Sequence, residues 1–168
     1  MTAITTSIVT HPAARLDAVA RAATALVWLA TAVLWLFAGG AMLGDQQGVG
    51  LIMIAAAVLL AGLCFYYRRR QPLGYRIEPD GLVVVERGGE RRIDGAVANP
   101  RDGGLGLRVL GSGGLYGYLG RFRLRDHQGP TRAYVSDLRH VTVVDVGATA
   151  IAVSPADRDA FAEEARHA

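Results

Sequence analysis

The chain has 168 residues, 51% of them hydrophobic, and its mean hydropathy of +0.25 is high for a soluble protein. All 18 basic residues are arginine, which excludes chemistry that needs a lysine, such as a P-loop or a Schiff base. A single cysteine, Cys64, excludes an internal disulfide and a cysteine-based zinc site. The net charge of +3 arises at the flanks of the apolar segments, so it does not indicate nucleic-acid binding.

Two apolar segments follow an N-terminal segment, residues 1–21. Residues 22–43 and 49–67 carry no acidic or basic side chain, and a helix of the first length spans about 33 Å, the thickness of a bilayer core. The turn at residues 44–48 is so short that the helices must be antiparallel neighbours. The pattern predicts a transmembrane hairpin over 22–67, and its lack of charge favours an anchor over a transporter.

Arginine gives the orientation of this hairpin. Arg15 and Arg21 precede it and an arginine triplet follows it, whereas the turn carries only Asp45. The positive-inside rule therefore predicts that both termini are cytoplasmic. Aromatic and cationic side chains at the end of the second helix are expected to anchor it at the membrane interface; they are Tyr66, Tyr67, Arg68, Arg69 and Arg70.

Small residues recur at a spacing of four in both helices, at Gly40 and Gly44 and at Ala57 and Ala61. Such spacing lets helices approach closely. We expect it to serve packing between the two helices of the hairpin; packing against a second copy is the alternative.

Residues 73–168 have the periodicity of a β domain. Short segments bounded by Gly, Pro and Asp replace the long apolar runs. About seven strands are expected, which favours an antiparallel sandwich or partly open barrel over alternating βα units. At the end, Ser154 is the expected N-cap of a helix that has Pro155 in its first position and Asp157 in its third, and that extends to about Arg166. Phe161 is its one large apolar residue, so this helix is expected to cover the sheet.

A family resemblance rests on two motifs. The run Gly-Gly-Leu-Tyr-Gly-Tyr-Leu-Gly at 113–120 precedes a strand, and Ser154-Pro155 with Asp157 opens the last helix. Over residues 75–161 the chain resembles the bacterial pleckstrin-homology-like (PH-like) domains, often found behind membrane spans. The resemblance implies two near-orthogonal antiparallel sheets with a C-terminal helix and a binding or assembly role, with no established activity. From the hairpin we expect a place in the bacterial inner membrane, and from the residues we expect no cofactor.

The glycine-rich stretch from Gly103 to Gly120 is the most unusual part of the domain. It fails the dinucleotide-binding fingerprint because Tyr116 stands where a third glycine is needed. One interpretation is a mobile loop that carries Tyr116 and Tyr118 toward a partner or the bilayer. The favoured alternative is that the glycines permit bends of a small barrel and the tyrosines pack locally.

Arg121, Arg123 and Arg125 alternate with apolar residues, so a strand here places three guanidinium groups on one face. Together with Tyr116 and Tyr118 they form the candidate interaction surface. This row of arginines is suited to binding anionic lipid headgroups. The simpler explanation is that acidic residues of the domain neutralise the three arginines on a solvated strand face. The turn at 78–81 is acidic, whereas phosphoinositide-binding eukaryotic relatives tend to use a basic first loop.

No metal or catalytic site is expected. The four histidines lack metal-binding spacing, and the glycines around Ser112 do not form a nucleophile elbow. A catalytic pocket would have to gather Ser112, His140 and an acid.

These patterns lead to two functional hypotheses. The first is a membrane-anchored interaction or scaffolding module that binds a protein, a peptide or a second copy of itself at the cytoplasmic face, with an exposed sheet edge as the docking place. The alternative is an accessory or sensory subunit that assembles into a larger membrane complex through its transmembrane helices.

Overall fold

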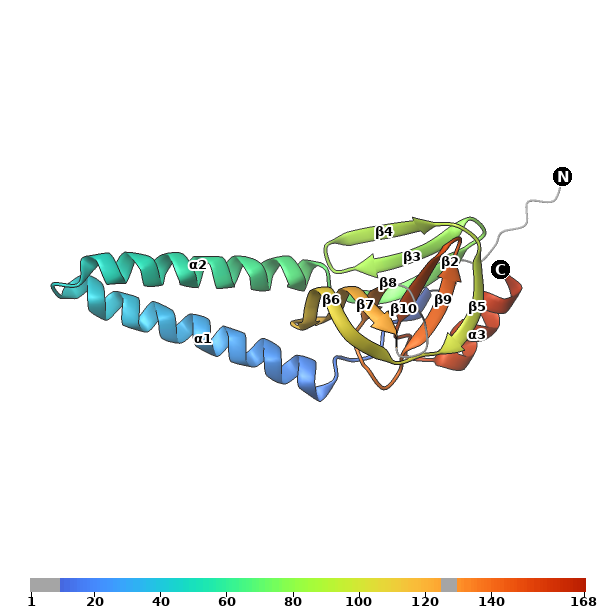
Figure 1. Ribbon diagram of the computed structural model, residues 1–168, viewed down its shortest axis with the longest axis horizontal. Coiled ribbons are helices and arrows are strands. Elements are labelled where there is room, and N and C mark those ends of the chain that lie inside the picture. Colours follow the sequence, from blue (N-terminus) through green and yellow to red (C-terminus); the bar gives the residue numbers. More distant parts are fainter. Residues whose placement is uncertain (1–9, 125–129) are drawn as a thin grey trace.

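A computed structural model describes residues 10–124 and 130–168. Figure 1 shows a long two-helix hairpin that projects from one end of a mainly β domain. Helices α1 (Ala18–Leu43) and α2 (Gln47–Arg69) form the hairpin, and α3 (Arg158–His167) lies against the domain at the far end. The expected fold class, two apolar helices followed by a two-sheet domain with a C-terminal helix, is confirmed.

The two hairpin helices pack along a seam of small residues. Thr31 and Ala38 of α1 and Gly50, Ala57 and Cys64 of α2 are buried at intervals of seven residues. This period keeps one stripe of each helix against its neighbour. At Gly50 the approach is so close that a Cβ atom would lie 2.9 Å from the Met42 side chain.

Only some of the small residues that were expected to pack between the helices lie in this seam. Ala57 lies in it, but a Cβ atom at Gly40 would meet nothing within 4 Å, so Gly40 is not packed in the seam. Both helices are long and apolar enough to cross a membrane, and only 11% of the apolar stretch in α1 and 17% in α2 is buried. A core helix of a soluble domain would be mostly buried. The two helices therefore expose so much apolar surface that an apolar phase or another molecule must cover it.

Within the described residues, ten strands form two sheets, three more strands than the seven expected. The first sheet has the order β1-β2-β3-β4 and the second the order β5-β9-β10-β8-β7-β6. The strands are β1 (Thr10–Pro12), β2 (Pro72–Glu78), β3 (Gly81–Glu86), β4 (Gly89–Asp94), β5 (Val97–Asp102), β6 (Leu105–Gly114), β7 (Gly117–Leu124), β8 (Pro130–Val135), β9 (Thr142–Val146) and β10 (Thr149–Val153).

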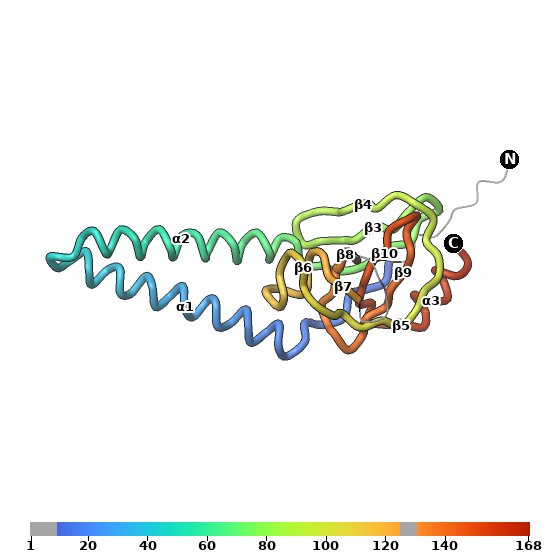
Figure 2. The backbone as a smooth tube through the Cα atoms, viewed as in Figure 1, coloured from blue at the N-terminus to red at the C-terminus, as the bar shows by residue number. Residues whose placement is uncertain are grey.

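One strand pair departs from the expected antiparallel arrangement. β10 runs parallel to β8, with Ile151 opposite Arg132 and Val153 opposite Tyr134. The cause is the β9-β10 hairpin, which inserts between β5 and β8, so that β10 meets β8 without a direct connection. Figure 2 shows the path of β5 and β6 curving around the outside of the domain.

Two apolar cores occupy the two faces of the six-stranded sheet. The larger core lies between this sheet, the four-stranded sheet and α3, and Tyr75 and Phe161 are its largest fully buried side chains. The second core lies in the curl of the six-stranded sheet and includes Phe122 and Val135, with Ala20 of α1 packed against it. The hairpin is thus continuous with the core of the domain.

The start of α3 differs from the expected cap. Asp157 is the N-cap, and its Oδ1 accepts a hydrogen bond of 3.0 Å from the backbone N–H of Ala160. Ser154 is instead fully buried, and its Oγ accepts a hydrogen bond of 2.7 Å from the N–H of Ser136. The prediction was wrong because long-range pairing holds Ser154 in extended backbone beyond β10, so the helix begins later.

The hairpin enters and leaves the domain through paired backbone. β1, just before α1, pairs antiparallel with β2, just after α2, and places Thr10 opposite Arg76. At α1, Asp17 caps the helix by accepting from the N–H of Ala20 at 2.7 Å, while its own N–H donates to the carbonyl of Ser136. These bonds hold the domain in one orientation relative to the helices.

Alkaline pH is expected to destabilise the domain through Tyr75. Burial raises the pKa of Tyr75 to about 12, although hydrogen bonds from Ser154 oppose the shift. The unfolded chain loses the Tyr75 proton near pH 10, whereas the folded chain keeps it until about pH 12. The contribution of Tyr75 to the free energy of unfolding is therefore fully present below pH 10 and falls as the pH rises toward 12. We expect this group to remove about 1 kcal/mol of unfolding free energy between pH 9 and pH 11. Denaturant unfolding followed by circular dichroism measures this fall, and Tyr75→Phe should show a shallower one; an equal slope in both proteins would contradict the assignment.

Candidate functional site

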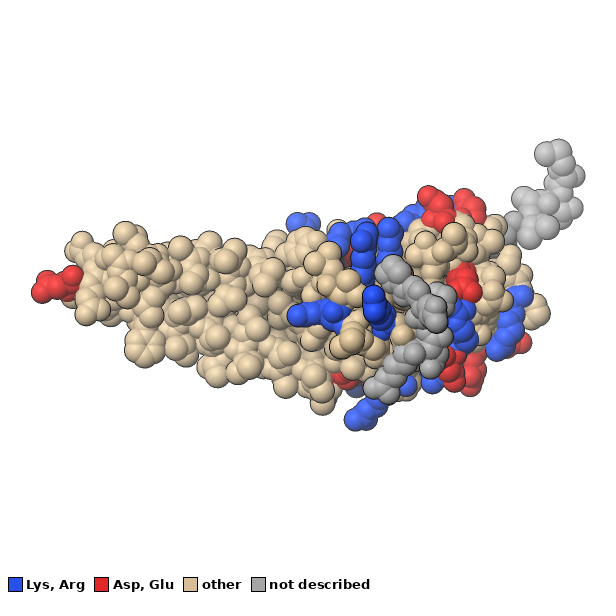
Figure 3. All heavy atoms as spheres, in the orientation of Figure 1, with Lys and Arg blue, Asp and Glu red and all other residues tan. Residues whose placement is uncertain are grey.

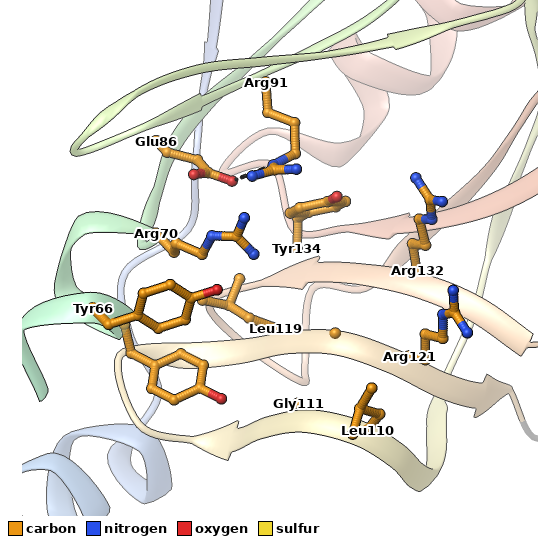
Figure 4. A pocket seen from close by; sticks show the side chains of 12 residues that line it. Tyr66, Arg70, Glu86, Arg91, Leu110, Gly111, Leu119, Arg121, Arg132 and Tyr134 are labelled. Carbon is orange, nitrogen blue, oxygen red and sulfur yellow. Dashed lines mark hydrogen bonds and ion pairs between the residues drawn. The ribbon is translucent and has the colours of Figure 1, made fainter. Parts of the chain in front are cut away.

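A pocket of about 460 Å³ opens at the end of α2, between the two sheets. The end of α2 forms one side, the ends of β3 and β4 a second, and strands β6, β7 and β8 the floor (Figure 4). The volume falls within the range of small-molecule sites. Its lining residues are Tyr66, Tyr67, Arg70, Glu86, Arg91, Leu110, Gly111, Leu119, Gly120, Arg121, Arg132 and Tyr134.

The pocket is strongly cationic. Four arginines line it, Arg70, Arg91, Arg121 and Arg132, against one acid, Glu86. The Nε of Arg91 donates to Glu86 at 3.0 Å. Burial lowers the pKa of Arg91 and the hydrogen bond to Glu86 raises it, with a net upward direction, so Arg91 stays charged. Three positive groups remain without a carboxylate in this lining, and the site therefore favours an anion.

Arg121 and Arg132 are neighbours because of strand register. They stand directly opposite each other on β7 and β8, and both are exposed. Like charges at such positions repel each other. Within residues 10–124 and 130–168, no carboxylate lies within 4.0 Å of either guanidinium group. Figure 3 shows arginine side chains gathered where the domain meets the helices.

The remaining lining residues supply aromatic and apolar surface. The guanidinium of Arg70 lies 5.2 Å from the ring centre of Tyr66, whose ring meets that of Tyr67 edge to face at 5.2 Å. Tyr134 lies on the β8 side of the pocket, as Figure 4 shows. Phenol groups donate hydrogen bonds, so this wall adds neutral donors to the charged ones.

Two glycines permit the close strand pairing in the floor. Gly111 and Gly120 face each other on β6 and β7 with φ of 122° and 131°. A Cβ atom at Gly111 would lie 2.0 Å from the carbonyl oxygen of Leu119, and one at Gly120 would lie 2.2 Å from that of Leu110. Only glycine fits both the conformation and the space.

The glycine-rich stretch forms the β6-β7 hairpin, and its tyrosines contact α1. Tyr116 sits in the turn with φ of 55°, where its N–H donates to Thr24 Oγ1 and its hydroxyl accepts from Trp28 Nε1 at 2.8 Å. Tyr118 is buried, and its hydroxyl lies 3.4 Å from Asp17 Oδ1. Desolvation and this carboxylate raise the pKa of Tyr118 to about 12. The structure therefore places both tyrosines at the junction with the hairpin.

The predicted arginine row is divided. Arg121 and Arg123 are exposed while Phe122 and Leu124 are buried, and Arg125 lies outside the described residues. Arg121 lines the pocket beside Tyr66, Tyr67 and Arg70 of the expected membrane anchor, which lie more than 50 residues earlier. Of the other anchor residues, Arg69 lies over the Phe65 ring at 5.6 Å, and Arg68 is exposed.

Sequence reasoning missed Arg91, Arg132 and Tyr134. The alternation in Thr-Arg-Ala-Tyr-Val at 131–135 does place Arg132 and Tyr134 on one face of a strand. No local signal, however, gives the register that brings this face to Arg121 and to the end of α2. Arg91 carries no distinguishing signal, because it lies in a strand with several charged residues.

Metal-binding and catalytic groups do not converge in the described part of the chain. No group of three or more His, Cys, Asp or Glu side chains there is placed to hold a metal ion. Ser112 donates to backbone carbonyls of its own hairpin, while His140 pairs with Asp137 at 3.0 Å and lines a different surface hollow.

Comparison with known families decides the identity of the domain. Residues 73–168, more than half of the chain, match the family described as bacterial PH domain. The chain belongs to the bacterial PH domain family. The resemblance of the sequence to PH-like domains is thereby confirmed, and PH domains are generally non-catalytic modules that bind proteins or lipids. Searches of curated proteins and of solved structures found no match.

Proposed function

We propose that the protein is a membrane-anchored interaction module, in which the hairpin spans the bacterial inner membrane and holds the PH domain at its cytoplasmic face. The observation that carries this proposal is the pairing of β1 with β2 on either side of the hairpin. It fixes both ends of the helices in one sheet, so the domain is presented in a set orientation. Weak binding suffices for a tethered module, because tethering raises its effective concentration.

Strand β6 is the proposed docking place for a protein partner. It is an edge strand of the six-stranded sheet, and its Leu107, Val109 and Leu110 side chains are 78%, 55% and 68% exposed. Soluble proteins usually blunt such edges with charge, whereas the exposed part of β6 carries one charged residue, Arg108. An extended segment of a partner or of a second copy can add to this edge through backbone hydrogen bonds.

Cysteine labelling tests the proposed topology. A Cys64→Ala background removes the single cysteine, and Asp45→Cys in the turn or Arg139→Cys on the domain then supplies one accessible thiol. In intact spheroplasts a membrane-impermeant maleimide should label position 45 and spare position 139 until the cells are lysed. Labelling of position 139 before lysis would contradict a cytoplasmic domain.

Photocrosslinking tests the docking place. A benzoylphenylalanine introduced at Leu107 in native membranes should form a discrete adduct, identified by mass spectrometry as a partner or a second copy. The same residue at Leu138, an exposed leucine outside β6, is the matched control. Equal adducts from both positions, or none from Leu107, would overturn the β6 assignment.

The accessory-subunit alternative also has a specific observation in its favour. Near the turn, a hollow of about 520 Å³ is lined by residues of both helices, including Phe37, Gly40 and Met53, and Gly40 is not packed in the seam. A helix of a larger complex fits such a surface. Replacing the hairpin with an unrelated one separates the two hypotheses, because cellular activity that survives the exchange excludes a role specific to these helices.

A further inference from the structure

We propose that the arginine pocket at the end of α2 binds the phosphate of an anionic phospholipid headgroup. This goes beyond the protein-docking role of β6, and only its lipid source rests on the proposed membrane anchoring. The first step is charge: three guanidinium groups in the lining, those of Arg70, Arg121 and Arg132, have no carboxylate partner among the described residues. Arginine binds phosphate oxygens through paired N–H donors, which makes phosphate the best-matched anion.

Several arginines elsewhere in the domain are paired with carboxylates. Arg76 pairs with Glu78 and Glu90, and Arg101 pairs with Asp145. Single exposed arginines with no carboxylate within 4.0 Å among the described residues, such as Arg139, also occur, but the pocket gathers several around one hollow. Keeping Arg121 opposite Arg132 costs stability in the empty pocket. A bound anion removes that cost.

The position of the pocket favours a lipid as the source of the bound phosphate. Tyr66, Tyr67 and Arg70 belong to the last turn of α2 or follow it directly, where an emerging transmembrane helix meets the headgroup layer. A headgroup of the inner leaflet therefore reaches the pocket without leaving the bilayer. Cationic surface at this level is attracted to anionic lipid.

The pocket also differs from the first hairpin turn, the loop expected to bind phosphoinositides in eukaryotic relatives. Around the β2-β3 turn, Glu78 and Asp80 are acidic, and both take up the guanidinium of Arg92. An anion is disfavoured there. We therefore place the anion site at the opposite end of the strands, next to α2, and not at this turn.

Lipid binding by the purified full-length chain in neutral detergent tests the proposal. Native mass spectrometry compares added phosphatidylglycerol with phosphatidylcholine, and a second arm titrates glycerol 3-phosphate without lipid. The pocket variant is Arg121→Gln with Arg132→Gln. The control, Arg139→Gln with Arg166→Gln, removes the same charge from exposed positions outside this pocket.

We expect the chain to prefer phosphatidylglycerol, and the pocket variant to bind it at least about tenfold more weakly, as the loss of charged hydrogen bonds implies. The control variant should stay within about twofold. The pocket variant should be at least as stable as the original chain, because it removes like-charge repulsion. Its destabilisation would indicate a structural role for the arginines and overturn the proposal.

Two further results would also overturn it. Equal phosphatidylglycerol binding by the pocket variant and the original chain would exclude this pocket. Tight binding of glycerol 3-phosphate with no lipid preference would exclude the lipid source and assign a soluble phosphate. None of these outcomes depends on the photocrosslinking at Leu107, so the two proposals fail separately.

Discussion

Replacing Phe161 with alanine is expected to lower the free energy of unfolding by about 3–5 kcal/mol. Phe161 is fully buried, and its ring meets the rings of His11 and Tyr75 at 5.3 Å and 6.2 Å. These three rings join α3, β1 and β2, so truncation leaves a cavity where three elements meet. Denaturant unfolding in detergent, followed by far-UV circular dichroism, measures the loss.

Phe65→Ala is the matched control for this prediction. Phe65 lies on α2 and is 59% exposed, so the same truncation creates no internal cavity. Its effect should be below about 1 kcal/mol. Equal effects at the two positions would show that α3 does not contribute its aromatic side chain to the stability of the core.

Replacing Gly111 with alanine is expected to distort the β6-β7 hairpin. The φ of 122° costs a non-glycine residue about 1–3 kcal/mol. The new Cβ atom must also displace the Leu119 carbonyl, which would otherwise lie 2.0 Å away. We expect a lower unfolding midpoint and weaker phosphatidylglycerol binding, because Gly111 lies in the floor of the pocket.

Gly113→Ala is the matched control, because it makes the same substitution in the same strand without a clash against the backbone. The nearest atom to a Cβ at Gly113 is Nη1 of Arg108 at 3.3 Å, the far end of a flexible side chain. This variant should unfold close to the original midpoint. If Gly111→Ala behaved in the same way, the tight pairing of Gly111 with Gly120 would not be a determinant of the hairpin.

The parts of the fold with local sequence signals were predictable. The charge-free apolar stretches indicate the helices, and the alternation in segments such as residues 131–135 indicates strands. β1 and β6 gave no such signal. β1 is three residues long and exists through its pairing with β2 across the hairpin, while the glycines of β6 lower its strand propensity although pairing with β7 permits them.

The candidate site was predictable only in fragments. Arg121 and the Tyr66–Arg70 segment were identified separately, for a strand face and for a membrane anchor. Their meeting depends on the register of β7 against β8 and on where α2 ends relative to the sheets, which are long-range features. Arg132 shows the limit most clearly, because its role follows from lying opposite Arg121 and not from its own neighbours in sequence.

The pairing of β1 with β2 has a consequence for biogenesis. In a spanning hairpin, these strands can meet only when both helix ends lie on the same side of the membrane. A half-inserted chain would leave β2 without its edge neighbour and His11 away from Phe161, with which it shares the core. In a membrane-spanning chain, completion of the domain therefore requires both helix ends to lie on one side, and a chain with only one helix across the membrane would expose the unpaired edge of β2 to quality-control proteases.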